Sequence, residues 1–329
     1  MITMPAPTFA ELMQTMRGFQ ESRVLLTAIE LDVFTAVGKG ATAAEVASRL
    51  RTDSRGTETL LNALAAMGAL AKKSGIFRNT PGTKRHLVAG SRDYARPGLM
   101  HIVNLWTTWD ALTACVRKGA AGAARRTEQQ QSEWTKSFIA AMHRNAAGMA
   151  AQAVRAVGTK GVRRLLDVGG GSGAYSIAFA KASKSLRAEV FDLATVVPIA
   201  QAHIRAAGLE GRIGTRVGDL HSDEFGQGYD MALLSAICHM LGPEENQDLF
   251  RRCWRALVPA GRLVIRDFIL GPDKARPKSA ALFAINMLVG TRSGGTYTMA
   301  EYTDWLRDAG FESVRRLDPA GDLIVATRK

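Results

Sequence analysis

The feature that most constrains the fold lies in the second half of the chain, where an apolar stretch runs directly into a glycine-rich turn. Residues 163–168 form a predicted buried strand, Gly169-Gly170-Gly171-Ser172-Gly173 follows, and a helix is predicted over 174–184. Glycines at such a turn let the backbone approach a ligand closely, and the helix start offers unpaired N–H groups. The sequence therefore predicts a strand–loop–helix unit that can bind a ligand at its turn.

The alternation of strand and helix continues beyond this unit. Further strands are predicted over 188–192, 212–217, 229–236 and 261–268, and further helices over 195–207 and 244–257. This succession predicts a mostly parallel sheet with helices on both faces. The chain then ends with a helix over 299–309 and strands over 312–317 and 323–327, joined by the short turn Pro319–Asp322. Because so short a connection requires a hairpin, we expect the last strand to run antiparallel.

The first half of the chain has the pattern of helices followed by a β-wing. Apolar residues recur at helical spacing from Phe9 to Gly38, and Thr42-Ala-Ala-Glu45 is a capping box. A cap at residues 52–54 precedes a helix predicted over 57–70, and short extended pieces over 71–80 predict a wing. Together they predict a winged helix-turn-helix arrangement.

Further helices are predicted from residue 98 to about 157, followed by a linker at Gly158–Gly161. We therefore expect a winged-helix-like domain over 1–97, a helical connector over 98–160 and an α/β domain over 161–329.

Composition limits the class of protein. At 329 residues the chain is too long for one ordinary core, and 47% apolar with 22% charged residues is typical of a folded globular protein. No apolar run is long enough for a membrane span, and Met1–Ala10 lacks the pattern of a secretory signal. Cys115, Cys238 and Cys253 form neither a metal-ligand pattern nor a disulfide framework, so we expect a cytoplasmic protein without a metal.

The formal net charge of +13 lies mostly in the first half of the chain. Residues 1–160 hold 21 Lys and Arg against 11 Asp and Glu, and residues 161–329 hold 22 against 19. Such an excess fits nucleic acid, an acidic substrate or a solvated surface. Because the basic residues are scattered singly or in pairs such as Lys72-Lys73, we favour the solvated surface.

Acidic residues at the strand ends indicate the kind of ligand. A dinucleotide loop has the spacing G-x-G-x-x-G, whereas this loop has G-x-G-x-G with Asp167 two residues before its first glycine. A carboxylate there would repel a pyrophosphate but can pair with an amino-acid ammonium or a sulfonium. Asp192 can accept both hydroxyls of a ribose, while Asp219 can take an adenine amino group and Leu220 can cover the ring. A single acid of this kind could merely cap the next helix, but three at successive strand ends predict a binding site.

Five segments in order carry a family resemblance: Leu-Asp-Val-Gly-Gly-Gly-Ser-Gly at 166–173, Val-Phe-Asp-Leu at 190–193, Gly-Asp-Leu at 218–220, Ile-Cys-His at 237–239 and Gly-Arg-Leu-Val-Ile-Arg-Asp at 261–267. The chain resembles the class I methyltransferases, and more narrowly the caffeic-acid-type and acetylserotonin-type O-methyltransferases, along essentially its whole length. The resemblance implies a Rossmann-like seven-stranded α/β sheet with one antiparallel strand, behind an all-α winged-helix-like dimerisation domain.

The same resemblance implies S-adenosyl-L-methionine as the cofactor and S-adenosyl-L-homocysteine as its product, with no metal. The residues that we assign to the cofactor are Asp167, Gly169, Gly171, Gly173, Asp192, Leu193, Gly218, Asp219, Leu220 and Ser235.

Methyl transfer from a sulfonium is a displacement on an already activated carbon, so the protein mainly positions the reactants and handles one proton. His239 matches the catalytic base of the family, and imidazole can exchange a proton near neutral pH. Asp267 matches the acid that orients this histidine. The chain departs from the family in two places: His239 is followed by Met-Leu where Asp-Trp is common, and a second acid is absent near Gly294–Thr298, where Tyr297 lies instead.

The resemblance places the acceptor pocket between the domains. The residues that match its lining are Met142 and His143 on a predicted helix 134–151, Phe283, Asn286 and Met287 on a predicted helix 278–290, and Tyr297. Apolar, Met-rich walls suit a flat aromatic or polyketide-like small molecule, although Met and Phe at helical spacing are equally common in cores. We therefore expect O-methylation of such an acceptor by a homodimer that pairs through its N-terminal domain.

Three alternatives remain at this stage. The altered residues after His239 leave room for relatives with the same fold and cofactor that hydroxylate, decarboxylate or rearrange their substrates. The winged-helix pattern and the basic first half fit a DNA-binding regulator, but helix 57–70 offers few side chains that could read bases. A nicotinamide dehydrogenase is disfavoured by Asp167 and the glycine spacing. We expect neither a nucleic-acid nor a membrane partner.

Overall fold

The computed structural model describes residues 6–122, 127–317 and 322–329. Within it the chain forms two compact units, Met1–Leu105 and Trp106–Lys329. In the part of the chain described, no helix is both long enough and apolar enough to cross a membrane.

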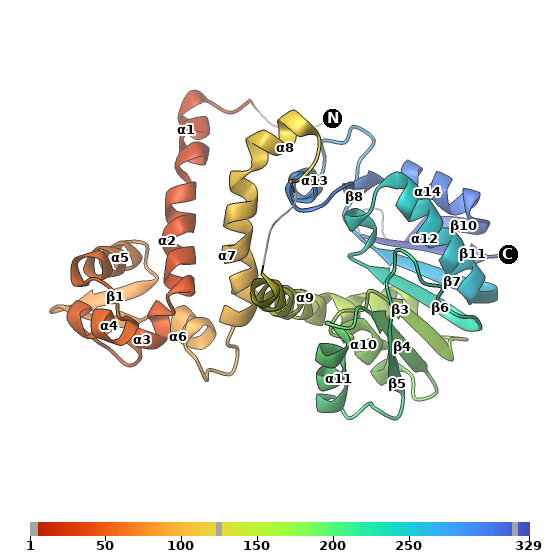
Figure 1. The fold of residues 1–329 in the computed structure, drawn as a ribbon, viewed down its shortest axis with the longest axis horizontal. Helices are drawn as coiled ribbons and strands as arrows, with labels where there is room; N and C mark the ends of the chain where they lie inside the picture. Colours follow the sequence, from red (N-terminus) through yellow and green to blue (C-terminus); the bar gives the residue numbers. More distant parts are fainter. Residues whose placement is uncertain (1–5, 123–126, 318–321) are drawn as a thin grey trace. The chain divides into compact units, whose positions relative to one another are not determined.

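The first unit is helical with a small wing, as the sequence predicts (Figure 1). A capping box between Thr42 and Glu45 opens α4, and the Asp53 side chain caps α5 by accepting from the Gly56 backbone. Strands β1 and β2 pair antiparallel to form the predicted wing. The elements are α1 (Phe9–Arg17), α2 (Phe19–Glu30), α3 (Val33–Val37), α4 (Ala43–Leu50), α5 (Ser54–Ala66), β1 (Leu70–Lys73), β2 (Ile76–Asn79) and α6 (Pro81–Leu87), and α7 (Arg96–Asp110) spans the end of this unit.

Two local breaks divide the helical stretch 9–38 into three helices. The first falls at Gly18, where α1 ends and α2 begins. The second falls at Leu31–Asp32, where Asp32 adopts a left-handed φ of 59° before α3. These turns let short helices pack around one core whose buried members include Val33, Phe34, Val46, Leu61, Leu64 and Phe77.

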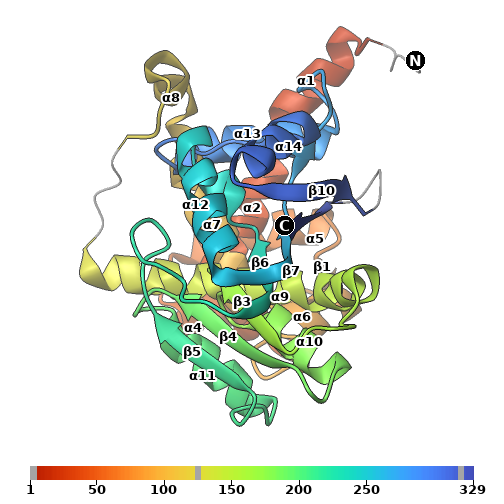
Figure 2. The ribbon, with the colours of Figure 1, turned by 90° about the vertical axis from the view of Figure 1, so that its right-hand side faces the viewer.

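The second unit is built on a seven-stranded sheet with the order β10-β11-β7-β6-β3-β4-β5 (Figure 2). Strands β3 to β7 run parallel, and β11 runs antiparallel to both β7 and β10, which confirms the predicted hairpin. Residues 319–321 of its predicted turn lie outside the described residues. The strands are β3 (Arg164–Val168), β4 (Arg187–Asp192), β5 (Ile213–Val217), β6 (Tyr229–Ser235), β7 (Leu257–Arg266), β10 (Phe311–Arg316) and β11 (Leu323–Arg328).

Helices cover both faces of this sheet, because side chains along each strand alternate between the faces. Helices α9, α10 and α11 cover one face, and α12 and α14 cover the other (Figures 1 and 2). Leu165 belongs to the buried cluster on the first face, whereas Leu166 belongs to the cluster on the second. The helices of this unit are α8 (Leu112–Lys118), α9 (Glu128–Val157), α10 (Ala174–Ala182), α11 (Val197–Ala206), α12 (Pro243–Ala256), α13 (Lys278–Gly290) and α14 (Met299–Asp308), with a 3₁₀ turn η1 (Cys238–Met240) and a short parallel pair β8 (Ile269–Leu270) and β9 (Tyr297–Thr298).

The strand order locates the functional edge of the sheet. From β3 the chain builds outward through β4 and β5 and then returns to place β6 on the other side of β3. In open parallel sheets, ligands bind at the carboxyl ends of the strands beside such a reversal. The ends of β3 and β6 lead into residues 169–173 and 236–241, which are therefore the first places to look for a site.

Candidate active site

The glycine loop after β3 is a tight turn that only glycine accommodates. Gly169, Gly171 and Gly173 have φ values of 64°, 57° and 72°, in the left-handed region that disfavours other residues. A Cβ atom on Gly169 would lie 2.3 Å from Cδ1 of Ile237, the residue just before the η1 turn. The loop thus packs directly against the chain that leaves β6, and the two candidate segments form one edge.

Asp167 lies beneath this loop with 1% of its surface exposed. Its Oδ2 accepts a hydrogen bond of 2.7 Å from the hydroxyl of Ser176 in the first turn of α10. Burial raises the pKa of Asp167 to about 6, against the lowering effect of the hydrogen bonds from Ser176, and the nearby charge of Asp192 adds to the rise. A positive charge placed near this carboxyl group would favour its ionised form.

Asp192 ends β4 and is tied to the same loop. Its Oδ2 accepts from the backbone N–H of Gly171 and its Oδ1 accepts from the N–H of Leu193, each at 2.8 Å. Burial is the main cause of its raised pKa, which these two hydrogen bonds partly offset. Each carboxylate oxygen keeps a second lone pair, so the group can still accept two donors from a ligand.

The third predicted acid, Asp219, lies in the loop that follows β5. Oδ1 of Asp219 accepts from the backbone N–H of His221 at 2.8 Å, and Leu220 is partly buried against the core. Gly218 allows a close approach, because a Cβ atom there would lie 2.3 Å from the ring of Phe191. Of the other predicted residues, Leu193 is half exposed and Ser235 ends β6.

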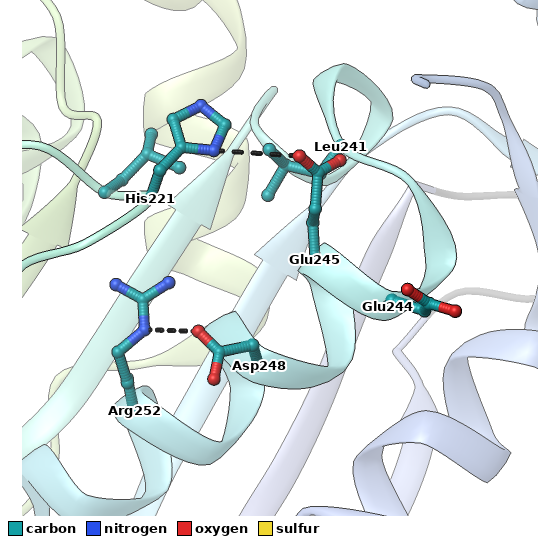
Figure 3. Close-up of a pocket in the computed structure, with 7 residues that line it drawn as sticks. His221, Leu241, Glu244, Glu245, Asp248 and Arg252 are labelled. Atoms are coloured by element: carbon teal, nitrogen blue, oxygen red, sulfur yellow. Dashed lines mark hydrogen bonds and ion pairs between the residues drawn. The ribbon is translucent and has the colours of Figure 1, made fainter. Parts of the chain in front are cut away.

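A hollow adjoins this segment on the side of α12 (Figure 3). Nδ1 of His221 lies 3.9 Å from Oε1 of Glu245, and Arg252 pairs with Asp248 at 2.8 Å. Glu245 also accepts from the Gly242 backbone and from Ser293. These carboxylates are engaged in helix capping and ion pairs, so the hollow has the character of a solvated surface rather than of a reaction site. Its lining residues are Leu220, His221, Leu241, Glu244, Glu245, Asp248 and Arg252.

His239 and Asp267 form a buried pair at the ends of β6 and β7. Nδ1 of the imidazole lies 2.6 Å from Oδ1 of Asp267, and the backbone N–H of His239 donates to Oδ2 at 3.1 Å. Phe268 N donates to the same Oδ1 at 2.7 Å. One carboxylate therefore fixes both the ring and the backbone of the histidine, and its two oxygens accept three N–H groups.

The backbone around this pair is held by several independent contacts. The amide of Asn246 donates to the carbonyls of Cys238, Leu241 and Gly242, which closes the turn after η1. Gly295 N donates to the carbonyl of His239 at 2.9 Å. A Cβ atom on Gly294 would lie 2.3 Å from that carbonyl oxygen, so glycine is required for this approach.

Two phenylalanine rings surround the imidazole. Phe283 on α13 meets His239 edge to face, with ring centroids 4.8 Å apart. Phe268 stacks on Phe283 at 3.8 Å and lies 6.0 Å from the His239 ring. The geometry brings together an imidazole–carboxylate pair, which can act as a general base, and two aromatic rings, which can pack against a flat apolar molecule.

The other residues that the sequence assigned to the acceptor pocket do not contact the His239 ring in the same way, and each has its own partner or burial. Oδ1 of Asn286 accepts from the indole N–H of Trp109 at 2.9 Å, and Met287 is buried. The hydroxyl of Tyr297 donates to the carbonyl of Leu241, next to the histidine turn. On α9, Met142 is half-buried, and Nδ1 of His143 lies 2.8 Å from the hydroxyl oxygen of Ser172 in the glycine loop.

Three residues at this edge were not singled out from the sequence. Ser176 bonds the buried Asp167, Phe268 follows Asp267, and His203 on α11 stacks on His143. Phe268 could have been found as the residue directly after a strand-end acid. The pairing of His143 with His203 has no local signal, because the two residues lie on different helices.

Comparison with known proteins agrees with this architecture. An O-methyltransferase domain model matches residues 109–312, and an O-methyltransferase dimerisation domain model matches residues 13–89. The chain is 37% identical to 3-hydroxy-5-methyl-1-naphthoate 3-O-methyltransferase of Streptomyces sahachiroi, with 94% of this chain and 92% of the relative covered. It is 28% identical to the tetracenomycin polyketide synthesis 8-O-methyl transferase TcmO of Streptomyces glaucescens, with 97% and 96% covered. The solved structure of PigF with SAH superposes with a TM-score of 0.89 at 28% identity, covering 98% of this chain and 100% of that one.

The chain belongs to the O-methyltransferase family that is defined by these two domain models. It is an S-adenosylmethionine-dependent O-methyltransferase with the mixed α/β fold and the N-terminal helical dimerisation domain of that family.

Proposed function

We propose that the enzyme methylates a phenolic hydroxyl of an aromatic or polyketide-type small molecule, with His239 as the general base. The observation that carries this proposal is the buried contact of 2.6 Å between Nδ1 of His239 and Asp267. Because the ionised carboxylate accepts the Nδ1 proton, the neutral ring has its lone pair on Nε2. That nitrogen can accept the proton of a substrate hydroxyl.

The residues present fit S-adenosylmethionine better than a dinucleotide. The buried Asp167, with its pKa raised to about 6, suits a cationic partner and opposes a pyrophosphate. Asp192 presents two oxygens that suit a ribose diol, and Gly218, Asp219 and Leu220 would hold the adenine. The other members of the proposed cofactor site are Gly169, Gly171, Gly173, Leu193 and Ser235.

When bound, S-adenosylmethionine supplies a methyl group that is activated by its sulfonium. The contribution of the chain itself is to hold a proton acceptor beside the incoming hydroxyl. Asp267 keeps the Nδ1 proton on His239 and stabilises the imidazolium that forms when Nε2 takes the substrate proton. General-base assistance of this kind contributes about 10²–10⁴-fold to the rate.

The acceptor class follows from the surroundings of His239. Phe268 and Phe283 offer flat, apolar faces next to the imidazole, and aromatic rings stack favourably on such faces. Met142 and Asn286 would add further contacts, as the sequence predicts, together with Met287 and Tyr297. The two bacterial relatives are named for a naphthoate and for tetracenomycin polyketide synthesis, which supports the same class.

The test is incubation of the full chain with S-adenosylmethionine and 3-hydroxy-5-methyl-1-naphthoate, the acceptor in the name of the Streptomyces relative. Hydroxynaphthoates that differ in hydroxyl position complete the panel. We expect S-adenosylhomocysteine and a product heavier by one CH2 in equal amounts. Product without methyl gain, or turnover of His239→Ala equal to that of the wild type, would refute the proposal.

We also propose that the chain forms a homodimer through its first unit. Helix α1 and the start of α2 expose a row of large apolar side chains at helical spacing, namely Phe9, Leu12, Met16 and Phe19. Phe9 is 76% exposed and Met16 is 58% exposed, values that are unusual for side chains of this size. The match to a dimerisation domain over residues 13–89 supports this assignment.

Sedimentation velocity tests the dimer directly. We expect a dimer for the wild type and a monomer for the Leu12→Glu/Met16→Glu double variant, because two buried charges per subunit would face an apolar partner. Gln14→Glu adds a charge to the same helix outside the apolar row and should remain dimeric. A monomeric wild type would rule the proposal out.

A further inference from the structure

The glycine loop has a single side chain by which the protein can fix its shape. In the run Gly169–Gly173 only Ser172 is not glycine, and three of the four glycines adopt left-handed φ values. Glycine loses more conformational freedom on ordering than any other residue, so such a loop tends to open without outside contacts. Ser172 is 4% exposed, so its hydroxyl is held inside the structure.

The partner of Ser172 comes from α9. Nδ1 of His143 lies 2.8 Å from the Ser172 hydroxyl oxygen. One helical turn earlier, Ile139 also reaches the loop, because a Cβ atom on Gly171 would lie 3.7 Å from its Cδ1. Helix α9 therefore contacts the loop through one apolar and one polar side chain on the same face.

His143 is held in turn by a second imidazole from α11. The rings of His143 and His203 stack with centroids 3.9 Å apart and an interplanar angle of 22°. Burial lowers the pKa of both rings, and the neighbouring His203 lowers the pKa of His143 further, so the surroundings favour the neutral form of each ring. Neutral rings can stack without charge repulsion. The loop is also held by the hydrogen bond that the backbone N–H of Gly171 donates to Asp192.

We infer that His143 is a positioning residue, which holds the cofactor loop in its binding shape through Ser172 and is itself braced by His203. This rests on the proposed placement of S-adenosylmethionine at the loop. It gives His143 a role on the cofactor side, in contrast to the acceptor-side role that the sequence predicts. Because a preordered loop does not have to be ordered on binding, loss of the contact weakens cofactor affinity. The methyl-transfer step depends on His239 and keeps its rate once the cofactor is bound.

Calorimetric titration of the full chain with S-adenosylhomocysteine measures the effect without any acceptor. We expect His143→Ala and Ser172→Ala each to weaken the Kd about 2- to 13-fold, the range for loss of one hydrogen bond. The double variant should bind no more weakly than the worse single variant, because both changes remove the same contact. With the naphthoate acceptor, the KM for S-adenosylmethionine should rise by the same factor while kcat at saturation stays unchanged.

Matched variants separate the hydrogen bond from general packing. Ser172→Thr keeps the hydroxyl and His203→Phe keeps an aromatic ring over His143, so both should retain near wild-type affinity, whereas His203→Ala should weaken it. His86→Ala makes the same change as His143→Ala in the first unit and should have no effect. If His143→Ala fails to fold, Ser172→Ala compared with Ser172→Thr carries the test.

The outcomes distinguish this inference from the proposal beneath it. Failure of the wild type to bind S-adenosylhomocysteine would refute the cofactor placement itself. Binding by the wild type with unchanged affinity in His143→Ala and Ser172→Ala would refute the inference alone. Additive losses in the double variant, or a fall in kcat that matches the rise in KM, would equally overturn it.

Discussion

The Asp267→Asn substitution tests the catalytic pair with little change of shape. In the protein, the two carboxylate oxygens accept three N–H groups, namely Nδ1 and the backbone N–H of His239 and the backbone N–H of Phe268. An amide has one oxygen and one NH2 group, so at least one of these donors would face another donor. The substitution also removes the negative charge that stabilises the imidazolium formed during proton transfer.

The size of the effect follows from these contacts. A hydrogen bond to a charged group contributes about 1.5–3 kcal/mol, and about 1.36 kcal/mol corresponds to a factor of ten in rate. If the stabilisation is lost mainly in the transition state, kcat should fall roughly 13- to 160-fold. His239→Ala should cost about 10²–10⁴-fold, because the base itself is gone.

The assay is the initial rate of S-adenosylhomocysteine formation with saturating naphthoate acceptor and cofactor. Because Asp267 acts through His239, the His239→Ala/Asp267→Asn double variant should be no slower than His239→Ala alone. Asp304→Asn makes the same chemical change at an exposed position of α14 and should retain full activity. Independent, multiplicative losses in the double variant, or an Asp267→Asn enzyme as active as Asp304→Asn, would refute the reasoning.

Three further predictions concern the loops of the site. The pKa of Asp167 is raised to about 6, and a bound cation favours the ionised form, so S-adenosylmethionine binding should release a proton below that pH. Calorimetry should therefore show roughly tenfold weaker binding of S-adenosylmethionine at pH 5 than at pH 7. Most of this difference should vanish in Asp167→Asn. Gly169→Ala should destabilise the loop by about 2–5 kcal/mol, because the alanine would be strained in the left-handed region and its Cβ would lie 2.3 Å from Ile237. We expect a lower Tm and loss of S-adenosylhomocysteine binding. Gly211→Ala, where a Cβ would meet no atom within 4 Å, should change neither. Gly294→Ala would place its Cβ 2.3 Å from the carbonyl oxygen of His239. The histidine would have to move, so kcat should fall at least tenfold. Gly290→Ala, whose Cβ would meet no atom within 4 Å, is the control, and equal activity of the two variants would contradict the prediction.

Short-range pattern is enough for much of this fold. The strand-end acids Asp167 and Asp192 and the proposed base His239 could be placed at one edge because parallel strands bring their carboxyl ends together. The capping box at Thr42 and Glu45 was readable because it depends on residues three positions apart. The helix breaks at Gly18 and Asp32 were not predicted, since apolar spacing continues across them and only packing shows where the chain turns.

The side-chain contacts within the site could not be predicted from the sequence. Trp109 donates to Asn286 across 177 positions of sequence, and His143 contacts Ser172 from a helix that the sequence assigned to the acceptor pocket. Asp167, which the sequence assigned to the ligand alone, also accepts a hydrogen bond from Ser176. Such contacts depend on how the helices pack on the sheet. Periodicity predicts which face of a helix or strand a residue occupies, but it does not predict which atoms its side chain contacts.

The sequence by itself determined most of the succession of strands and helices along the chain, the glycine spacing that disfavours a dinucleotide, and the acids and histidine at the strand ends, because each depends on neighbours close along the chain. Only the tertiary structure decided that Asp267 contacts both the ring and the backbone of His239, that two phenylalanine rings lie beside this histidine, and that His143, stacked on His203, contacts Ser172 of the glycine loop. These contacts join segments far apart in sequence, and their geometry exists only once both faces of the sheet are packed.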